Sequence, residues 1–122
     1  MELGQVAVHA DDLDRARAFY ELLTGTKPTG FFDPPGLLFF QLGGVRLLLD
    51  RAAPPSLIYL KAPDIFATVE RLRGAGVTIE SEPRVIFEHT DASLGPVGTA
   101  EWQAFVRDSE GNLVGLVEHR DS

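Results

Sequence analysis

The most informative absence in this 122-residue sequence is that of cysteine. Without a thiol the chain can form no disulfide and no cysteine-based zinc site, and a cysteine nucleophile is excluded. No apolar run approaches the length of a membrane-spanning helix, and Met1 leads into a strand-like segment without the basic and apolar regions of a signal peptide. These absences predict a soluble cytoplasmic protein with no membrane partner.

Basic residues are also scarce, because 11 lysines and arginines stand against 18 aspartates and glutamates and leave a formal net charge of −7 at pH 7. Such a charge repels a phosphate backbone, so we expect no nucleic-acid partner. The sequence contains no glycine-rich phosphate loop, no Gly-x-Ser-x-Gly elbow and no His-Glu-x-x-His helix. Nucleotide hydrolysis, serine hydrolysis and zinc proteolysis therefore have no support.

What the sequence does contain is a weak internal repeat, in which residues 3–50 and 55–118 share one order of elements. In each copy a strand-like segment leads through an aspartate into apolar residues at helical spacing. This pattern predicts helices over residues 13–23 and 65–73, each followed by a glycine that can end it. Three short strands complete each copy.

The last strands of the two copies also match, since Gly43–Asp50 resembles Gly111–Glu118. The offset between the copies is larger here than at their first strands, so the second copy carries extra residues. We place them in the stretch 90–100, whose glycines and proline predict a loop and a candidate lid. The order strand, helix, three strands, repeated twice, predicts an α+β fold of two βαβββ modules with mixed sheets. We expect one domain over residues 1–122, with modules at about 3–50 and 55–118.

Two motifs give this repeat a family resemblance. Residues 12–20 read Asp-Leu-Asp-Arg-Ala-Arg-Ala-Phe-Tyr, and residues 105–113 read Phe-Val-Arg-Asp-Ser-Glu-Gly-Asn-Leu. They resemble the vicinal oxygen chelate superfamily, the glyoxalase and bleomycin-resistance fold, with Ser109 where the family's turn carries proline. The resemblance implies that the paired modules form an open, cup-shaped barrel around a ligand site. Because the family includes metalloenzymes and metal-free drug-binding proteins, the fold does not settle the function.

The resemblance also points to four positions where the metalloenzymes hold a divalent metal, on the first and last strands of each module. His, Gln and Glu side chains are the donors there. The repeat places these positions at Gln5, Leu47, Leu57 and Gly115. One amide cannot hold a catalytic metal, and a shift of one residue would select side chains on the other sheet face. We therefore expect no metal and no cofactor.

Alternation along the strands separates a face that packs on the helix from a face that lines the cup. The helix face is assigned to Val6, Val8, Ile58, Leu60, Trp102, Ala104 and Val106. The predicted ligand-binding residues are Gln5, His9, Phe39, Leu47, Leu57, Tyr59, Gln103, Phe105 and Arg107. No catalytic residue is assigned, because no carboxylate at a recognisable spacing pairs with His9. His89 is interpreted as an exposed residue at a loop edge and His119 as part of a frayed tail.

These observations predict a metal-independent protein that sequesters or senses a small molecule, aromatic or partly apolar, with the acidic charge favouring a cationic one. The alternative is a glyoxalase-like lyase, isomerase or dioxygenase with an atypical metal site, in which His9 or Tyr59 handles protons. A third hypothesis is a structural or interaction domain whose own Phe and Leu side chains fill the cup. Open strand edges predict a homodimer.

Overall fold

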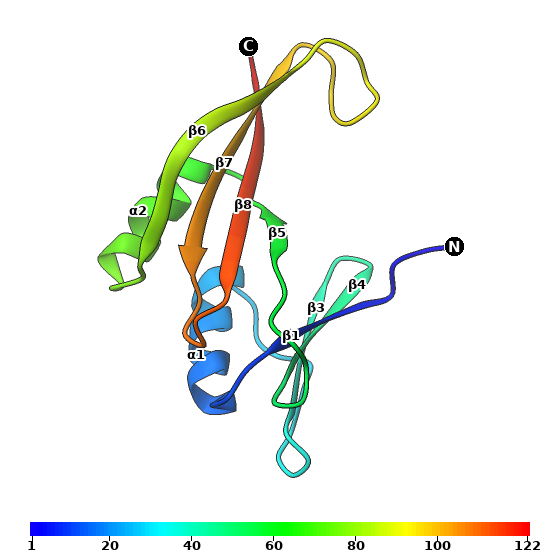
Figure 1. Ribbon diagram of the computed structural model, residues 1–122, viewed down its shortest axis with the longest axis vertical. Coiled ribbons are helices and arrows are strands. Elements are labelled where there is room, and N and C mark those ends of the chain that lie inside the picture. Colours follow the sequence, from blue (N-terminus) through cyan, green and yellow to red (C-terminus); the bar gives the residue numbers. More distant parts are fainter. The chain divides into compact units, whose positions relative to one another are not determined.

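The computed structural model describes residues 1–122 and divides them into two compact units, each with its own sheet and helix (Figure 1). One unit comprises Met1–Leu57 and Asp108–Asn112, and the other comprises Ile58–Arg107 and Leu113–Ser122. Each unit holds a four-stranded mixed sheet whose elements follow the order strand, helix, three strands. The predicted α+β fold of two βαβββ modules is confirmed. Neither helix is long and apolar enough to cross a membrane.

The first unit has the strand order β1-β4-β3-β2. Its elements are β1 (Gln5–His9), α1 (Leu13–Thr24), β2 (Gly30–Phe32), β3 (Leu37–Leu42) and β4 (Val45–Asp50). Helix α1 begins where the Asp12 carboxylate accepts the backbone N–H of Arg15, and it ends at Gly25, whose φ of 71° suits glycine. The core lies between α1 and one sheet face, where the Tyr20 ring packs 6.2 Å from Phe40.

The register of this sheet corrects one predicted position. Leu47 pairs with Val6 and Phe40, so it lies on the buried side that faces α1. Leu48 pairs with Ala7 and Phe39 and takes the place on the open face. The prediction aligned β4 with its counterpart through the preceding glycines, but the strand pairing shifts that alignment by one residue. A leucine therefore stands at the open-face position in either alignment.

The second unit has the strand order β5-β8-β7-β6. Its elements are β5 (Ile58–Lys61), α2 (Ile65–Gly74), β6 (Ile79–His89), β7 (Thr99–Arg107) and β8 (Leu113–Asp121). Helix α2 is capped by Asp64, whose carboxylate accepts the backbone N–H of Ala67. The Phe66 ring of α2 packs 5.0 Å from Trp102, on the sheet face predicted to meet the helix. The opposite face carries Tyr59 and Phe105.

The predicted loop and tail of the second unit need correction. The loop is shorter than 90–100, because β7 already begins at Thr99. At its two ends the loop is tied to the sheet, since the Gly98 backbone N–H donates to His89 O at 2.8 Å. Strand β8 continues to Asp121, so His119 is not part of a frayed tail but pairs with Glu101. Figure 1 shows this loop beyond the ends of β6 and β7, beside the C-terminus.

The turn from Asp108 to Asn112 belongs to the first unit, although it connects β7 to β8. Buried Asp108 accepts the Tyr20 hydroxyl at 2.7 Å and the Asn112 side-chain amide at 2.8 Å. Its other oxygen accepts the backbone N–H groups of Glu110 and Asn112. Burial, then the nearby Asp108 charge, raises the pKa of Tyr20 far above its usual range.

Glu110 from the same turn holds the start of α1. Its carboxylate accepts the backbone N–H groups of Asp11 and Asp12 at 2.9 and 2.8 Å, and Arg15 Nε donates to it at 2.7 Å. Burial alone would raise the pKa of Glu110, but the hydrogen bonds from Arg15 and Asp12 outweigh it and lower the pKa to about 2. The two family motifs of the sequence are thus the two sides of one hydrogen-bonded network.

Candidate functional site

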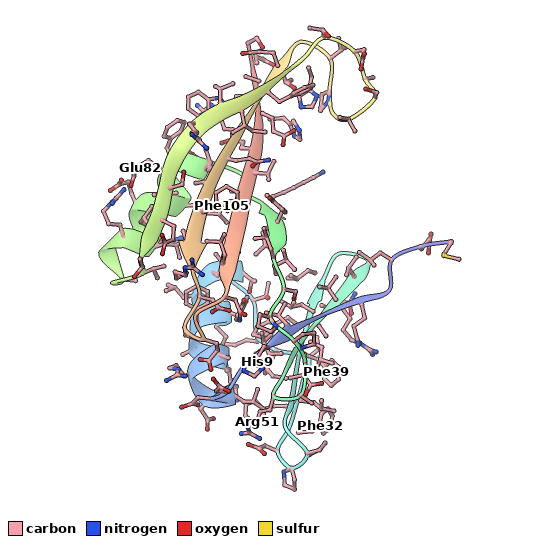
Figure 2. All side chains as sticks on the ribbon, in the orientation of Figure 1. His9, Phe32, Phe39, Arg51, Glu82 and Phe105 are labelled. Atoms are coloured by element: carbon pink, nitrogen blue, oxygen red, sulfur yellow. The ribbon has the colours of Figure 1, made fainter.

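An aromatic pair lies on the open face of the second sheet. Tyr59 of β5 and Phe105 of β7 stand on either side of Gly115 in the central strand β8. Their ring centroids are 5.8 Å apart with an interplanar angle of 76°, an edge-to-face arrangement. Tyr59 is 50% exposed, and Phe105 is half-buried and labelled on its strand in Figure 2. The pair is a ready surface for a flat apolar molecule.

The ring of Tyr59 lies directly over Gly115. A Cβ atom added at Gly115 would come within 2.5 Å of Tyr59 Cδ2, which real Cβ atoms essentially never do. Gly115 is one of the four positions at which the resemblance expects a metal donor. The space that a donor side chain would need there is filled by an aromatic ring.

Polar residues flank the pair along β7. Arg107 Nε donates to the Glu80 carboxylate at 3.0 Å, and the Gln103 amide donates to Glu101 at 2.8 Å. Four predicted ligand-binding residues therefore share one sheet face, namely Tyr59, Gln103, Phe105 and Arg107.

The open face of the first sheet carries a second aromatic pair. Phe32 and Phe39 lie 6.1 Å apart at an interplanar angle of 71°, and both are labelled in Figure 2. The Arg46 guanidinium lies 5.0 Å from the centre of the Phe39 ring and donates to Gln5 at 2.6 Å. The structure thus brings together two further predicted residues, Gln5 and Phe39, through Arg46.

His9, at the end of β1 (Figure 2), has both ring nitrogens engaged by oxygen acceptors. Nδ1 lies 2.9 Å from the carbonyl oxygen of Ala53, and Nε2 lies 2.9 Å from the Asp11 carboxylate. The hydrogen bond to Asp11 raises the pKa of His9, while burial opposes it. Both hydrogen bonds form together only when the ring is protonated, and a protonated ring has no lone pair with which to act as a general base.

The two remaining predicted residues do not join either aromatic pair. Leu47 is buried on the helix side of the first sheet. Leu57 is exposed and precedes β5.

A polar cluster that the sequence interpretation missed lies on the same open face as Tyr59 and Phe105. His89 Nε2 and His119 Nε2 lie 2.9 and 3.2 Å from Glu101 Oε1. His89 is buried, not exposed at a loop edge as predicted. Burial alone would raise the pKa of Glu101, but hydrogen bonds from Gln103, His89 and His119 together lower it. One donor atom from each of His89, Glu101 and His119 lies within 4.8 Å of the others, close enough to hold a metal ion.

A signal for this cluster was present in the sequence. A tight turn at 108–112 fixes the register of the hairpin on either side of it, and that register sets Glu101 opposite His119. The interpretation of residues 119–122 as a frayed tail ended β8 too early. No sequence signal gave the position of His89, because β6 has several register shifts against β7.

Two βαβββ modules with open sheet faces define a class of folds that hosts both binding proteins and enzymes. The chain belongs to the Glyoxalase/Bleomycin resistance protein/Dioxygenase superfamily, whose family model matches residues 2–116. No curated protein matches the chain.

Solved structures of the same fold include an antibiotic binding protein, TnmS3 from Streptomyces sp. CB03234. It is 22% identical with a TM-score of 0.76, and the match covers 98% of this chain and 97% of that one. Lactoylglutathione lyase from Agrobacterium tumefaciens is 24% identical with a TM-score of 0.71, over 96% and 92% of the two chains. A superfamily member from Alicyclobacillus acidocaldarius is 18% identical with a TM-score of 0.69, over 98% and 92%. At these identities the likeness shows the fold alone.

Proposed function

We propose that this protein binds a small, flat, partly apolar organic molecule without the help of a metal, and that it sequesters or senses that molecule. The ligand rests on the open sheet face that carries Tyr59 and Phe105. The observation that carries the proposal is the Tyr59 ring lying over Gly115, where a donor side chain would otherwise stand. At a position where the resemblance expects a metal ligand, the chain instead presents an exposed aromatic ring.

Two further facts support binding over catalysis. The fold is shared with a protein described as antibiotic binding, so it can host a binder. It is also shared with a lyase, but His9, the first candidate for proton transfer, has both ring nitrogens engaged. Gln103 and Arg107 on the same face supply polar groups that can orient a ligand.

A thermal-shift screen of a metabolite and drug panel in buffer containing EDTA tests this proposal. A ligand that binds only the folded state stabilises it by roughly 2.7 kcal/mol at a hundredfold excess over its dissociation constant. We expect Tyr59→Ala and Phe105→Ala to weaken each hit by at least about tenfold, or ~1.4 kcal/mol. Gly115→Ala should weaken it too, because the new methyl group displaces the Tyr59 ring.

The matched control is Phe66→Ala. It removes a partly exposed aromatic ring of α2 that packs on Trp102, on the opposite face of the same sheet. Hits should bind this variant as tightly as the parent protein. Hits that bind Tyr59→Ala and Phe105→Ala with unchanged affinity, or a panel that gives hits only when EDTA is left out of the buffer, would contradict the proposal.

We also propose that two copies of the chain pair through strand β6. Val85, Ile86 and Phe87 are consecutive on this edge strand and are 41%, 43% and 47% exposed. Val85 lies opposite Trp102 and Phe87 lies opposite Glu101, which are on opposite faces of the sheet, so both faces of this stretch carry uncovered apolar surface. Sedimentation at micromolar concentration should show a dimer that Ile86→Glu converts to a monomer, whereas Leu94→Glu, in the loop outside β6, leaves it paired. A monomeric parent protein would refute the pairing.

A further inference from the structure

Three potential metal ligands converge at one end of the second sheet, outside the positions used by the superfamily's metalloenzymes. His89 ends β6, while Glu101 of β7 lies directly opposite His119 of β8. The Nε2 atoms of the two histidines are 2.9 and 3.2 Å from the same Glu101 oxygen, and the three donor atoms lie within 4.8 Å of one another. An ion held at roughly 2.0–2.1 Å by tetrahedral donors separates those donors by about 3.3 Å. The observed spacing therefore needs only small side-chain adjustments to close on an ion.

We propose that His89, Glu101 and His119 bind a divalent transition-metal ion of the zinc type. Two imidazoles and one carboxylate are donors that zinc accepts, and three protein ligands leave a fourth position for water or a small molecule. The ion replaces the two hydrogen bonds to Glu101, with each ring in the tautomer that carries its hydrogen on Nδ1. The site departs from the expectation of a metal-free chain, which was based on four other positions.

Neighbouring groups already hold the donors in place. The His89 side chain is only 1% exposed, and its ring packs against Phe87 at 4.8 Å and His119 at 5.1 Å. The Gln103 amide donates to the second oxygen of Glu101 at 2.8 Å and so fixes the carboxylate. Metal ligands are commonly oriented by such outer partners, whose loss weakens metal affinity by roughly 10–100-fold.

The loop between β6 and β7 lies against the open side of the cluster. A Cβ atom added at Gly95 would come within 2.9 Å of both His89 Nε2 and His119 Nε2. The space between the two donor nitrogens is therefore open only because residue 95 has no side chain. This closeness also means that an ion in the site would lie directly beneath the loop.

The site is separate from the aromatic pair of the proposed function. Glu101 and Phe105 are four residues apart on β7, which is about 13 Å along a strand. The metal proposal does not depend on small-molecule binding, and either proposal can fail alone.

Calorimetric titration of the EDTA-stripped, untagged chain with zinc, followed by dialysis and elemental analysis, tests the site. We expect about one equivalent per chain, and cobalt should bind with the visible absorption of a four-coordinate ion. Because loss of an outer partner already weakens affinity 10–100-fold, His89→Ala, Glu101→Gln and His119→Ala should each weaken it by at least about 100-fold. Gln103→Leu should weaken zinc affinity by about 10–100-fold. His9→Ala removes the one histidine outside the cluster and should leave zinc binding unchanged.

A glycine pair gives a second test that removes no ligand. Gly95→Ala should abolish zinc binding by placing a methyl group against both donor nitrogens. Gly74→Ala, at the end of α2 with open space around it, should bind zinc like the parent protein. Neither glycine has a positive φ, so backbone strain does not enter the comparison.

Circular dichroism of each metal-free variant separates loss of the site from loss of the fold. If His89→Ala unfolds because its side chain is buried, the more exposed His119→Ala carries the test. Absence of saturable zinc uptake by the parent at micromolar concentration would overturn the proposal. Folded ligand variants that bind zinc as tightly as the parent would overturn it equally.

Discussion

Each unit contains carboxylates that accept several hydrogen bonds, but the groups that donate those hydrogen bonds differ between the two units. In the first unit Asp108 and Glu110 are bound by Tyr20, by Arg15 and by backbone N–H groups. In the second unit Glu101 is bound by two imidazoles and one amide. Backbone N–H groups and arginine have no lone pair to offer an ion, whereas an imidazole does. The comparison distinguishes carboxylates whose hydrogen bonds stabilise the fold from a carboxylate that can bind a metal ion together with two histidines.

The aromatic pairs of the two units differ in a similar way. Both pairs include a ring close to a glycine backbone, Phe32 over Gly30 and Tyr59 over Gly115. In the first unit the Arg46 guanidinium already covers the Phe39 ring. In the second unit Tyr59 stays half exposed. This difference is why the proposed ligand surface is centred on the second sheet.

The largest expected effect comes from breaking the first network. Asp108→Ala leaves the Tyr20 hydroxyl, the Asn112 amide and two backbone N–H groups without their acceptor, and should lower the free energy of unfolding by about 3–5 kcal/mol, since each unsatisfied buried donor costs about 1–3 kcal/mol. Glu101→Gln, which keeps its shape, should cost about 1 kcal/mol in the metal-free protein. Urea unfolding followed by circular dichroism measures both.

Tyr20→Phe serves as the control, because it removes only one donor of the Asp108 network and should cost about 1 kcal/mol. Equal destabilisation by Asp108→Ala and Glu101→Gln would mean that both networks are structural, and the contrast between the units would be lost.

A smaller effect is expected from Glu110, and it depends on pH. The pKa of this carboxyl is lowered to about 2 in the folded protein from its ordinary 4.5. Its stabilisation is therefore complete above pH 4.5 and is lost as the pH falls from there through about 2. We expect Glu110→Gln to lower the free energy of unfolding by about 1.5–3 kcal/mol at pH 7. Near pH 2 the variant should be about as stable as the parent protein.

The pKa of Glu101 is also lowered. The loss of unfolding free energy in Glu101→Gln should therefore also shrink as the pH falls, but it should be smaller than the loss in Glu110→Gln. Unfolding free energies measured between pH 2 and pH 7 for the parent and both variants compare the two units directly. A Glu110→Gln deficit that persists unchanged at acid pH would show that packing, and not charge, is what the side chain provides.

The order of elements could be predicted from the sequence because each copy repeats the same local signals. Asp12 and Asp64 both cap their helices, and apolar residues at helical spacing mark the buried sides of α1 and α2. The sheet faces were also predictable around Tyr59 and Phe105, since alternation along a strand needs no tertiary information.

The errors have identifiable physical causes. Leu47 was assigned to the open face because glycine turns were used to align β4 with β8, whereas hydrogen bonding to β1 sets the register. His119 was missed because polar residues near a chain end resemble a frayed tail, although pairing with β7 keeps them in a strand. The position of His89 depends on bulges in β6 that leave no mark in the residue pattern.

The assignment of Asp108–Asn112 to the first unit has a consequence for the genetic dissection of the duplicated modules. A gene fragment that ends at Leu57 encodes every helix and strand of the first unit but lacks the turn that satisfies Tyr20 and the start of α1. Such a half-gene therefore encodes an incomplete folding unit, because the turn that completes the first unit lies in the second half of the sequence. Any cut between Tyr20 and Asp108 separates the two sides of this network, so fragments used in complementation assays must reassociate to restore it.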